Sequence, residues 1–388
     1  MVELPQAPLH RFKIFRMEKV NWEWWWDIDP PLFWSTLILL SLGIVMVFSA
    51  SMTTGLDLFA DPFFFLKRHL VGLGVSLPFF VAASVFNLEL LRRLSRKLLV
   101  FSFILLILVF VPGIGREVGG AYRWLAIGFQ PSELAKLSVI LYMADALVHY
   151  RDRAQDFIYG VVPFLLVVGG TCLLVLLAPS LGTALFLVII AFLMLYLGGR
   201  RIFHLLLPVI IIIPTVFFLV FFSGNVYWRA RVESFLNPEK DPLGKGFQII
   251  QSLIALGSGG IFGLGLGESR QKFFYLPERH TDFIFAIIGE EFGFVGTLSI
   301  LVLFGVILWR GWRIAVQTQN EFEGLLAMGL TLSIFVQATI NLSVVLKIIP
   351  ITGITLPLMS YGNSSLLITL IKIGILFNIA SRKKGNVG

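Results

Sequence analysis

The chain has 388 residues, of which 57% are hydrophobic and only 14% are charged, and its formal net charge is +8. Soluble domains carry about 25% charged residues and must wet a large surface, so this composition excludes a soluble enzyme, a disordered chain and a fibrous protein. The mean hydropathy of +0.87 indicates a protein that crosses a membrane many times. The basic residues lie scattered between apolar runs, which favours membrane orientation over nucleic-acid binding as their role.

Apolar runs of roughly 20 residues predict ten membrane-spanning helices, because a helix of that length crosses the hydrocarbon core. The expected spans are residues 33–54, 68–87, 97–112, 133–149, 159–177, 183–198, 202–223, 282–309, 324–346 and 357–379. The predicted fold class is therefore an all-α polytopic membrane protein with one large loop, at about 224–281. The first span begins too far into the chain, and is too long, for a cleavable signal peptide.

Lysine and arginine predict the orientation of these spans. More than half of the 31 basic residues fall in one alternating set of segments. By the positive-inside rule that set is cytoplasmic, so both termini lie inside and the large loop lies outside. The chain then divides into a cytoplasmic N-terminal segment (1–32), a ten-span membrane domain (33–380) and a basic cytoplasmic tail (381–388). The tryptophan cluster at 22–26 is interpreted as an anchor at the membrane interface.

Several cations remain on the predicted outer face, where the positive-inside rule does not place them. The short outer segments carry Lys67, Arg68, Arg116, Arg123 and Lys347, and the large loop adds more. Cations kept on this side of a membrane usually have an anionic partner, and a phosphate-bearing lipid is a natural candidate.

One apolar stretch, Gly246–Gly267, is long enough to be mistaken for a further span. If it crossed the membrane, the basic clusters of all later segments would move to the outer face. We therefore predict a surface-lying or re-entrant helix at Gln248–Leu256, followed by a glycine-rich turn.

Three polar clusters at the outer face could carry chemistry, and the first is Gly119–Ser138. Pro131 suits the first turn of a helix, on which Glu133 and Lys136 share one face because they are three residues apart. They could form a structural ion pair or one charged wall of a water-filled cavity. Arg123 could present its guanidinium to a diphosphate.

The second cluster, Arg270–Gly296, places Asp282 at the start of a long apolar helix. The basic residues Arg270, Lys272, Arg279 and His280 precede it. Asp282 could cap the free backbone amides of that helix, or it could act as a general base beside cations. Glu290 and Glu291 follow about two turns deeper, where two adjacent carboxylates cannot share one helix face.

The third cluster, Lys347–Leu367, is an irregular segment that leads into the last span. Its hydroxyl and amide groups belong to Ser360, Tyr361, Asn363, Ser364 and Ser365. These groups could bind a sugar or a peptide, or they could join helices to one another.

The three clusters, in this order and spacing, resemble the SEDS family (shape, elongation, division and sporulation) of bacterial RodA and FtsW proteins. The resemblance covers about residues 33–380 and is closer to FtsW and its sporulation relatives than to RodA. The motifs that carry it are GAYRW with QPSELAKL, ARVESFLNP, YLPERHTDFIFAIIGEE and TGITLPLMSYGNSSLL.

The resemblance implies a peptidoglycan glycosyltransferase that polymerises lipid II into glycan strands at the outer face of the bacterial cytoplasmic membrane. It implies a central cavity among the ten spans, a catalytic carboxylate at Asp282, and cavity-lining groups at Glu133, Lys136 and Arg123. It also implies a class B penicillin-binding protein, a transpeptidase, as the partner. Ser180 departs from the family, which usually has an aspartate there, and Asn363 stands where glycine is common.

The residues themselves agree with that chemistry. A lipid-linked diphosphate leaving group needs cations such as Arg123, Lys136 or Arg279, or a divalent cation (Mg or Mn), and the attacking hydroxyl needs a base. Inversion requires one base and no covalent intermediate, by analogy with inverting glycosidases. We predict that Arg279, His280, Ser360, Tyr361, Asn363 and Ser364 contact the substrate. A lipid-linked precursor flippase and a transporter or channel remain as alternatives, and the sequence does not choose among division, elongation and sporulation.

Overall fold

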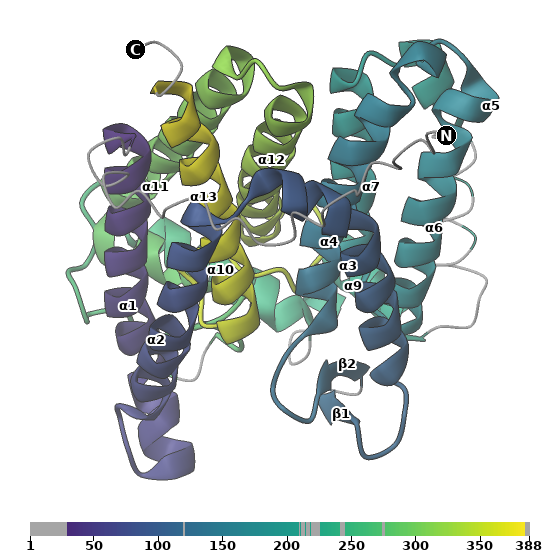
Figure 1. The fold of residues 1–388 in the computed structure, drawn as a ribbon. Helices are drawn as coiled ribbons and strands as arrows, with labels where there is room; N and C mark the ends of the chain where they lie inside the picture. The colour runs from purple at the N-terminus through teal and green to yellow at the C-terminus, as the bar shows by residue number, and fades with distance from the viewer. Residues whose placement is uncertain are drawn as a thin grey trace, which may run out of the picture.

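The computed structural model describes residues 29–118, 121–208, 210, 214, 218, 226–240, 245–273 and 276–384. Most of the regular structure in these residues is helical, and the long helices stand side by side as a bundle (Figure 1). They are α1 (Pro30–Phe59), α2 (Phe64–Val85), α3 (Leu88–Leu108), α4 (Pro131–His149), α6 (Val162–Leu177), α7 (Leu181–Leu197), α11 (Ile284–Gln317), α12 (Glu321–Val345) and α13 (Asn363–Lys384). Of the described helices, α1, α2, α11, α12 and α13 are long and apolar enough to cross a membrane.

Shorter elements connect these helices. They are β1 (Gly115–Val118), β2 (Ala121–Leu125), η2 (Arg151–Arg153), α5 (Phe157–Gly160), α9 (Val226–Leu236), η3 (Pro238–Lys240) and α10 (Lys245–Ser258). The antiparallel pair β1–β2 lies beyond one end of the bundle, opposite the end where α13 finishes (Figure 1). We call this the hairpin end, and it corresponds to the predicted outer face.

Most of the predicted spans overlap one long helix each. The seventh, 202–223, begins as a helix at 202–208, and most of its remainder lies outside the described residues, as do the tryptophan cluster at 22–26 and the end of the basic tail. The helix bounds differ from the predicted ones where a helix extends past the apolar run into charged sequence. Thus α3 begins at Leu88 rather than 97, and α11 continues to Gln317 rather than 309. The last span begins later than predicted, because residues 357–362 are irregular.

Capping residues explain where several helices begin. Asp29 accepts a hydrogen bond from the amide of Leu32 at 3.2 Å, and prolines occupy the first turn of α1. The same carboxylate accepts from Nε of Arg310 at 2.9 Å, which ties the start of α1 to α11. Asn320 caps α12 through the amide of Phe322 at 3.0 Å.

Small residues let the helices approach closely. A Cβ atom at Gly374 of α13 would lie 2.5 Å from the carbonyl oxygen of Phe80 and 2.9 Å from Cβ of Ala83, both on α2. Gly311 of α11 likewise faces Thr331 of α12. Because hydrocarbon tails are as apolar as the helices, such close packing is a main source of helix association in a membrane.

The apolar stretch at 246–267 does not form a long helix. Its helical part, α10, has 14 residues, which is too short to cross a bilayer. Ser252 of α10 donates to the carbonyl oxygen of Val345 at 2.9 Å, and the glycine-rich turn that follows lies against α11. This agrees with the predicted surface-lying or re-entrant helix.

Replacing Gly374 with alanine should destabilise the protein, because its new Cβ would overlap the backbone of α2. We expect a loss of about 1–3 kcal/mol, typical of overpacking. The matched control is Gly305→Ala in α11, where nothing lies within 4 Å of the added atom. The control should be neutral or gain up to about 1 kcal/mol of helix propensity. Thermal melting in detergent separates them, and equal melting temperatures would refute the packing argument.

Candidate active site

Asp282 lies in the turn that precedes α11, at the hairpin end. It does not cap that helix, because the N-cap position is Phe283 and no side-chain capping bond forms there. Its backbone carbonyl accepts from Nδ2 of Asn341 on α12 at 2.7 Å. A Cβ at Gly353, whose φ is 75°, would lie 3.6 Å from Oδ2 of Asp282 and 3.9 Å from Nη2 of Arg231. The glycine therefore leaves room between a carboxylate and a guanidinium.

Burial raises the pKa of Asp282 to about 7. The nearby carboxylate of Glu278 acts in the same direction, whereas Arg231 and Arg123 oppose it. A general base works best when its pKa is near the working pH. This pKa is compatible with the general-base alternative, and the capping alternative has no support in the structure.

Two arginines approach Asp282 from different parts of the chain. Arg123 of β2 donates from Nε to the carbonyl oxygen of Ala178 at 3.0 Å, and from Nη2 to that of Pro179 at 2.6 Å. Arg231 of α9 is buried and donates to the carbonyl oxygen of Ile351 at 2.9 Å. Both influence the charge of Asp282, so this corner of the site is cationic.

Glu133 and Lys136 form the predicted ion pair inside the bundle. Nζ of Lys136 lies 2.7 Å from Oε1 of Glu133 and donates to Oε1 of Gln337 at 2.9 Å. A third charged residue, Lys372 of α13, interacts electrostatically with both members of the pair. The two ammonium groups lie 5.1 Å and 5.8 Å from the ring centre of Phe186. The cluster therefore contains one carboxylate and two lysines.

Arg279 and His280, which were predicted to contact the substrate, make contacts within the protein and also line a hollow of about 390 Å³. Arg279 is buried and donates to α1, at the carbonyl oxygen of Ala50 (3.0 Å) and the hydroxyl of Thr53 (2.9 Å). His280 packs against Phe65, with ring centres 4.7 Å apart, and burial lowers the pKa of its imidazole to about 4. His280 is thus neutral near pH 7, and it cannot serve as a cation for a diphosphate.

Two hollows flank this region. The larger, about 390 Å³, opens between the end of α1, the start of α2 and the turn 277–280, and its lining includes Asp57, Phe65 and Glu278. The smaller, about 10 Å³, lies beside Arg123 and Ser180 and has room for about one water molecule. Asp282 is not among the residues that line either hollow.

The hydroxyl groups of the third cluster mostly join segments of the protein. Ser360 donates to the carbonyl oxygen of Thr281 at 2.6 Å, and Ser364 accepts from the amide of Gln130 at 3.0 Å. Tyr361 packs against His280, and Asn363 donates to the carbonyl oxygen of Arg68 at 3.5 Å. The structure thus favours the helix-joining alternative for Ser360 and Ser364, which hold the turn of Asp282 and the start of α4.

Sequence reasoning missed two charged residues of this region. Arg231 lay inside the quoted motif ARVESFLNP, but no role was assigned to it. Lys372 is the only charged residue between Lys347 and Arg382. An isolated lysine in an apolar run usually faces the interior of the bundle and has a partner there, so the sequence does carry a signal for it. Within the described residues, no group of three or more His, Cys, Asp or Glu side chains could hold a metal ion.

A bundle of apolar helices with a partly buried carboxylate and two arginines at one end defines a polytopic membrane protein with a candidate catalytic site. The chain belongs to the FtsW, RodA and SpoVE family, described as "Cell cycle protein", which it matches over residues 30–385.

Named relatives cover most of the chain. Stage V sporulation protein E of Bacillus subtilis is 44% identical over 89% of this chain and 94% of its own length. A probable peptidoglycan glycosyltransferase FtsW of Geobacter sp. (strain M18) is 40% identical over 92% and 98%.

Solved structures show the same fold. A chain from a study of how a peptidoglycan synthase complex coordinates polymerization and crosslinking has a TM-score of 0.76 and 34% identity, covering 91% of this chain and 97% of its own. The rod shape determining protein RodA of Thermus thermophilus has a TM-score of 0.67 and 30% identity, covering 92% and 97%.

The composition of the Glu133 cluster predicts an asymmetric response to mutation. Glu133→Gln leaves two buried lysines without their carboxylate and should cost about 3–5 kcal/mol of stability. Lys136→Met should cost less, because Lys372 still interacts electrostatically with Glu133. Melting temperatures in detergent should therefore fall in the order wild type, Lys136→Met, Glu133→Gln. The exposed Lys67→Met serves as a control with little change, and the reverse order of the two variants would refute this three-residue cluster.

Proposed function

We propose that this protein is a peptidoglycan glycosyltransferase that polymerises lipid II into glycan strands at the outer face of the bacterial cytoplasmic membrane. The observation that carries the proposal is Asp282, a partly buried carboxylate with a pKa of about 7 near Arg123 and Arg231 at the hairpin end. Membership of the family and relatives named peptidoglycan glycosyltransferase support the same activity.

In this mechanism Asp282 accepts the proton of the attacking sugar hydroxyl. The hydroxyl oxygen forms a new bond to the anomeric carbon of the donor sugar, and the bond from that carbon to the diphosphate breaks. The electron pair leaves with the lipid diphosphate, whose negative charge Arg123 and Arg231 stabilise. One base and one displacement invert the anomeric centre without a covalent intermediate.

The proposal includes an orientation and a partner. The hairpin end faces outward and both termini lie in the cytoplasm, because the basic segments cluster at the opposite side of the membrane. The partner is a class B penicillin-binding protein, whose transpeptidase would crosslink the glycan strands; a structural relative comes from a synthase that joins polymerization to crosslinking. A flippase would use the same cations, but it has no need of a base, so it leaves Asp282 without a role.

Replacing Asp282 with asparagine should abolish polymerisation while preserving the fold. Asparagine keeps the shape of the side chain but cannot take a proton, and loss of general-base help typically costs 10²–10⁴-fold in rate. The assay is polymerisation of labelled lipid II by the purified protein with a candidate transpeptidase. Asp61→Asn, an exposed carboxylate paired with Lys67, is the control and should keep full activity. Wild-type turnover by the Asp282 variant would rule this residue out as the base.

Removing the charge of Glu278 should shift the pH dependence of the reaction. The base must be ionised, so the rate should rise as the pH passes the pKa of Asp282, near 7. Glu278 raises that pKa, so Glu278→Gln should move the midpoint of the rise to lower pH. The measurement is initial rate against pH for both proteins. An unchanged midpoint would show that the titrating base is a different group.

A further inference from the structure

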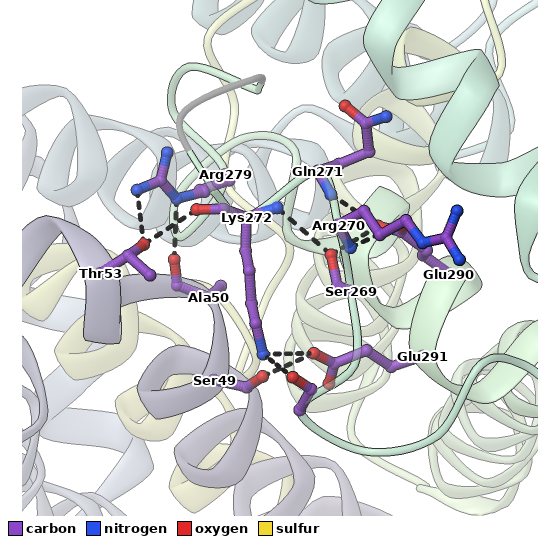
Figure 2. Close-up of polar contacts among 11 residues, drawn as sticks. Ser49, Ala50, Thr53, Ser269, Arg270, Gln271, Lys272, Arg279, Glu290 and Glu291 are labelled. Atoms are coloured by element: carbon purple, nitrogen blue, oxygen red, sulfur yellow. Dashed lines mark hydrogen bonds and ion pairs between the residues drawn. The ribbon is translucent and has the colours of Figure 1, made fainter.

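Glu290 and Glu291 are adjacent carboxylates inside α11, each with 1% of its surface exposed. Glu290 accepts three hydrogen bonds from one turn of the preceding loop (Figure 2). The donors are the hydroxyl of Ser269, the amide of Arg270 at 3.0 Å and the amide of Gln271 at 3.3 Å. The carboxylate thus holds this turn at the side of the helix, and hydrogen bonds to a charged acceptor are the stronger kind.

Glu291 points to the other side and joins three elements. Its Oε1 accepts from the hydroxyl of Ser49 on α1 at 2.7 Å and lies 3.4 Å from Nζ of Lys272 (Figure 2). Lys272 is buried and also donates to the carbonyl oxygen of Gly267. Because a lone buried charge is costly, this ion pair fixes the loop against both α1 and α11.

The backbone of α11 is open where the loop meets it. Gly293 has φ 64°, and the helical hydrogen bonding is interrupted there. The amide of Leu264 donates to the carbonyl oxygen of Glu290 at 2.9 Å, and the amide of Phe294 donates to that of Gly260 at 2.9 Å. The glycine-rich turn therefore satisfies backbone groups that the break exposes, which sets the register of the loop along α11.

The anchored turn is connected to the turn of Asp282 through contacts with α1 and with Ser360. Thr53 of α1 donates to the carbonyl oxygen of Lys272 at 2.8 Å and accepts from Arg279 at 2.9 Å, so it holds the loop at two points (Figure 2). Ser360 then binds the carbonyl oxygen of Thr281. These contacts form a continuous connection from the two glutamates to the proposed base, ten residues beyond Lys272.

Neither glutamate is placed to act as a second base. Both are buried, and Glu290 has its oxygens occupied by donors from the loop. The side-chain bonds found for the pair go to the loop and to Ser49, among the described residues. Their loss should therefore disturb the loop before it disturbs the rest of the bundle.

We propose that Glu290 and Glu291 are positioning residues that hold the described parts of the preceding loop, 264–273 and 276–282, in register with α11 and so place Asp282 for proton transfer. The inference rests on the proposed function of Asp282 as the base. The proposal predicts that the glutamates affect kcat rather than KM, because they act through the loop and do not contact the substrate. A displacement of about 1 Å can cost roughly 10²-fold in rate.

The test measures kcat and KM for lipid II polymerisation by the full chain with its transpeptidase partner. Glu290→Gln and Glu291→Gln should lower kcat by about 10–100-fold and change KM by less than about twofold. Lys272→Met should behave like Glu291→Gln, whereas Lys272→Arg, which keeps the charge, should recover much of the rate. The matched control is Glu233→Gln, an exposed carboxylate paired with Arg229, which should change neither constant.

Two milder variants keep the test decisive if the glutamate variants do not fold. Ser49→Ala and Ser269→Ala each remove one hydrogen bond to a glutamate without leaving a buried charge, and they should also lower kcat. Unchanged kcat with a lowered melting temperature in all the variants would make the glutamates purely structural and overturn the proposal.

Failure of the proposed function would look different. If the wild type itself makes no polymer, the assigned activity is wrong. Hydrogen exchange over residues 276–282 then still tests the anchoring, because Glu290→Gln and Ser269→Ala should speed exchange there and Glu233→Gln should not. Unchanged exchange in those two variants would overturn the positioning role itself.

Discussion

A charge inside the hydrocarbon core must have a partner, and the interior of this protein is organised around that constraint. Lys136 faces Glu133, and Lys272 faces Glu291, with all four side chains largely withdrawn from solvent. Each pair joins different parts of the chain or lies where several helices meet. Separating the partners would leave an unpaired buried charge, which is costly. The pairs therefore fix the relative positions of segments that otherwise share only apolar surfaces.

The same cost of burying a charge also affects the pKa of Asp282, the proposed base. Burial raises the pKa of Asp282 to about 7; Glu278 acts in the same direction, and Arg231 and Arg123 oppose it. The surrounding backbone is held by Asn341, Ser360 and the loop anchored on α11, so the side chain need not form its own structural bonds. Glu133 and Glu291 thus restrain the structure, and we propose Asp282 as the carboxylate that takes part in proton transfer.

Hydropathy predicted most of the bundle because long apolar runs determine which segments cross a membrane. It failed at boundaries, such as the first two turns of α3, where amphipathic sequence continues a helix past the apolar run. Local motifs predicted the ion pair of Glu133 and Lys136 and selected Asp282 as the candidate base. They did not predict that Arg279 binds α1, or that Lys372 lies near the ion pair. Those facts depend on contacts between segments far apart in the chain, and neither spacing nor composition contains that information.

The serine at position 180 shows how the site can tolerate a departure from its family. The usual aspartate would place a full negative charge close to Arg123. Here Ser180 donates to Thr183 at 2.9 Å, and Arg123 is held by the carbonyl oxygens of Ala178 and Pro179. Carbonyl oxygens carry only partial charges, so they orient the guanidinium without neutralising it. In the proposed reaction, Arg123 would stabilise the negative charge of the departing diphosphate.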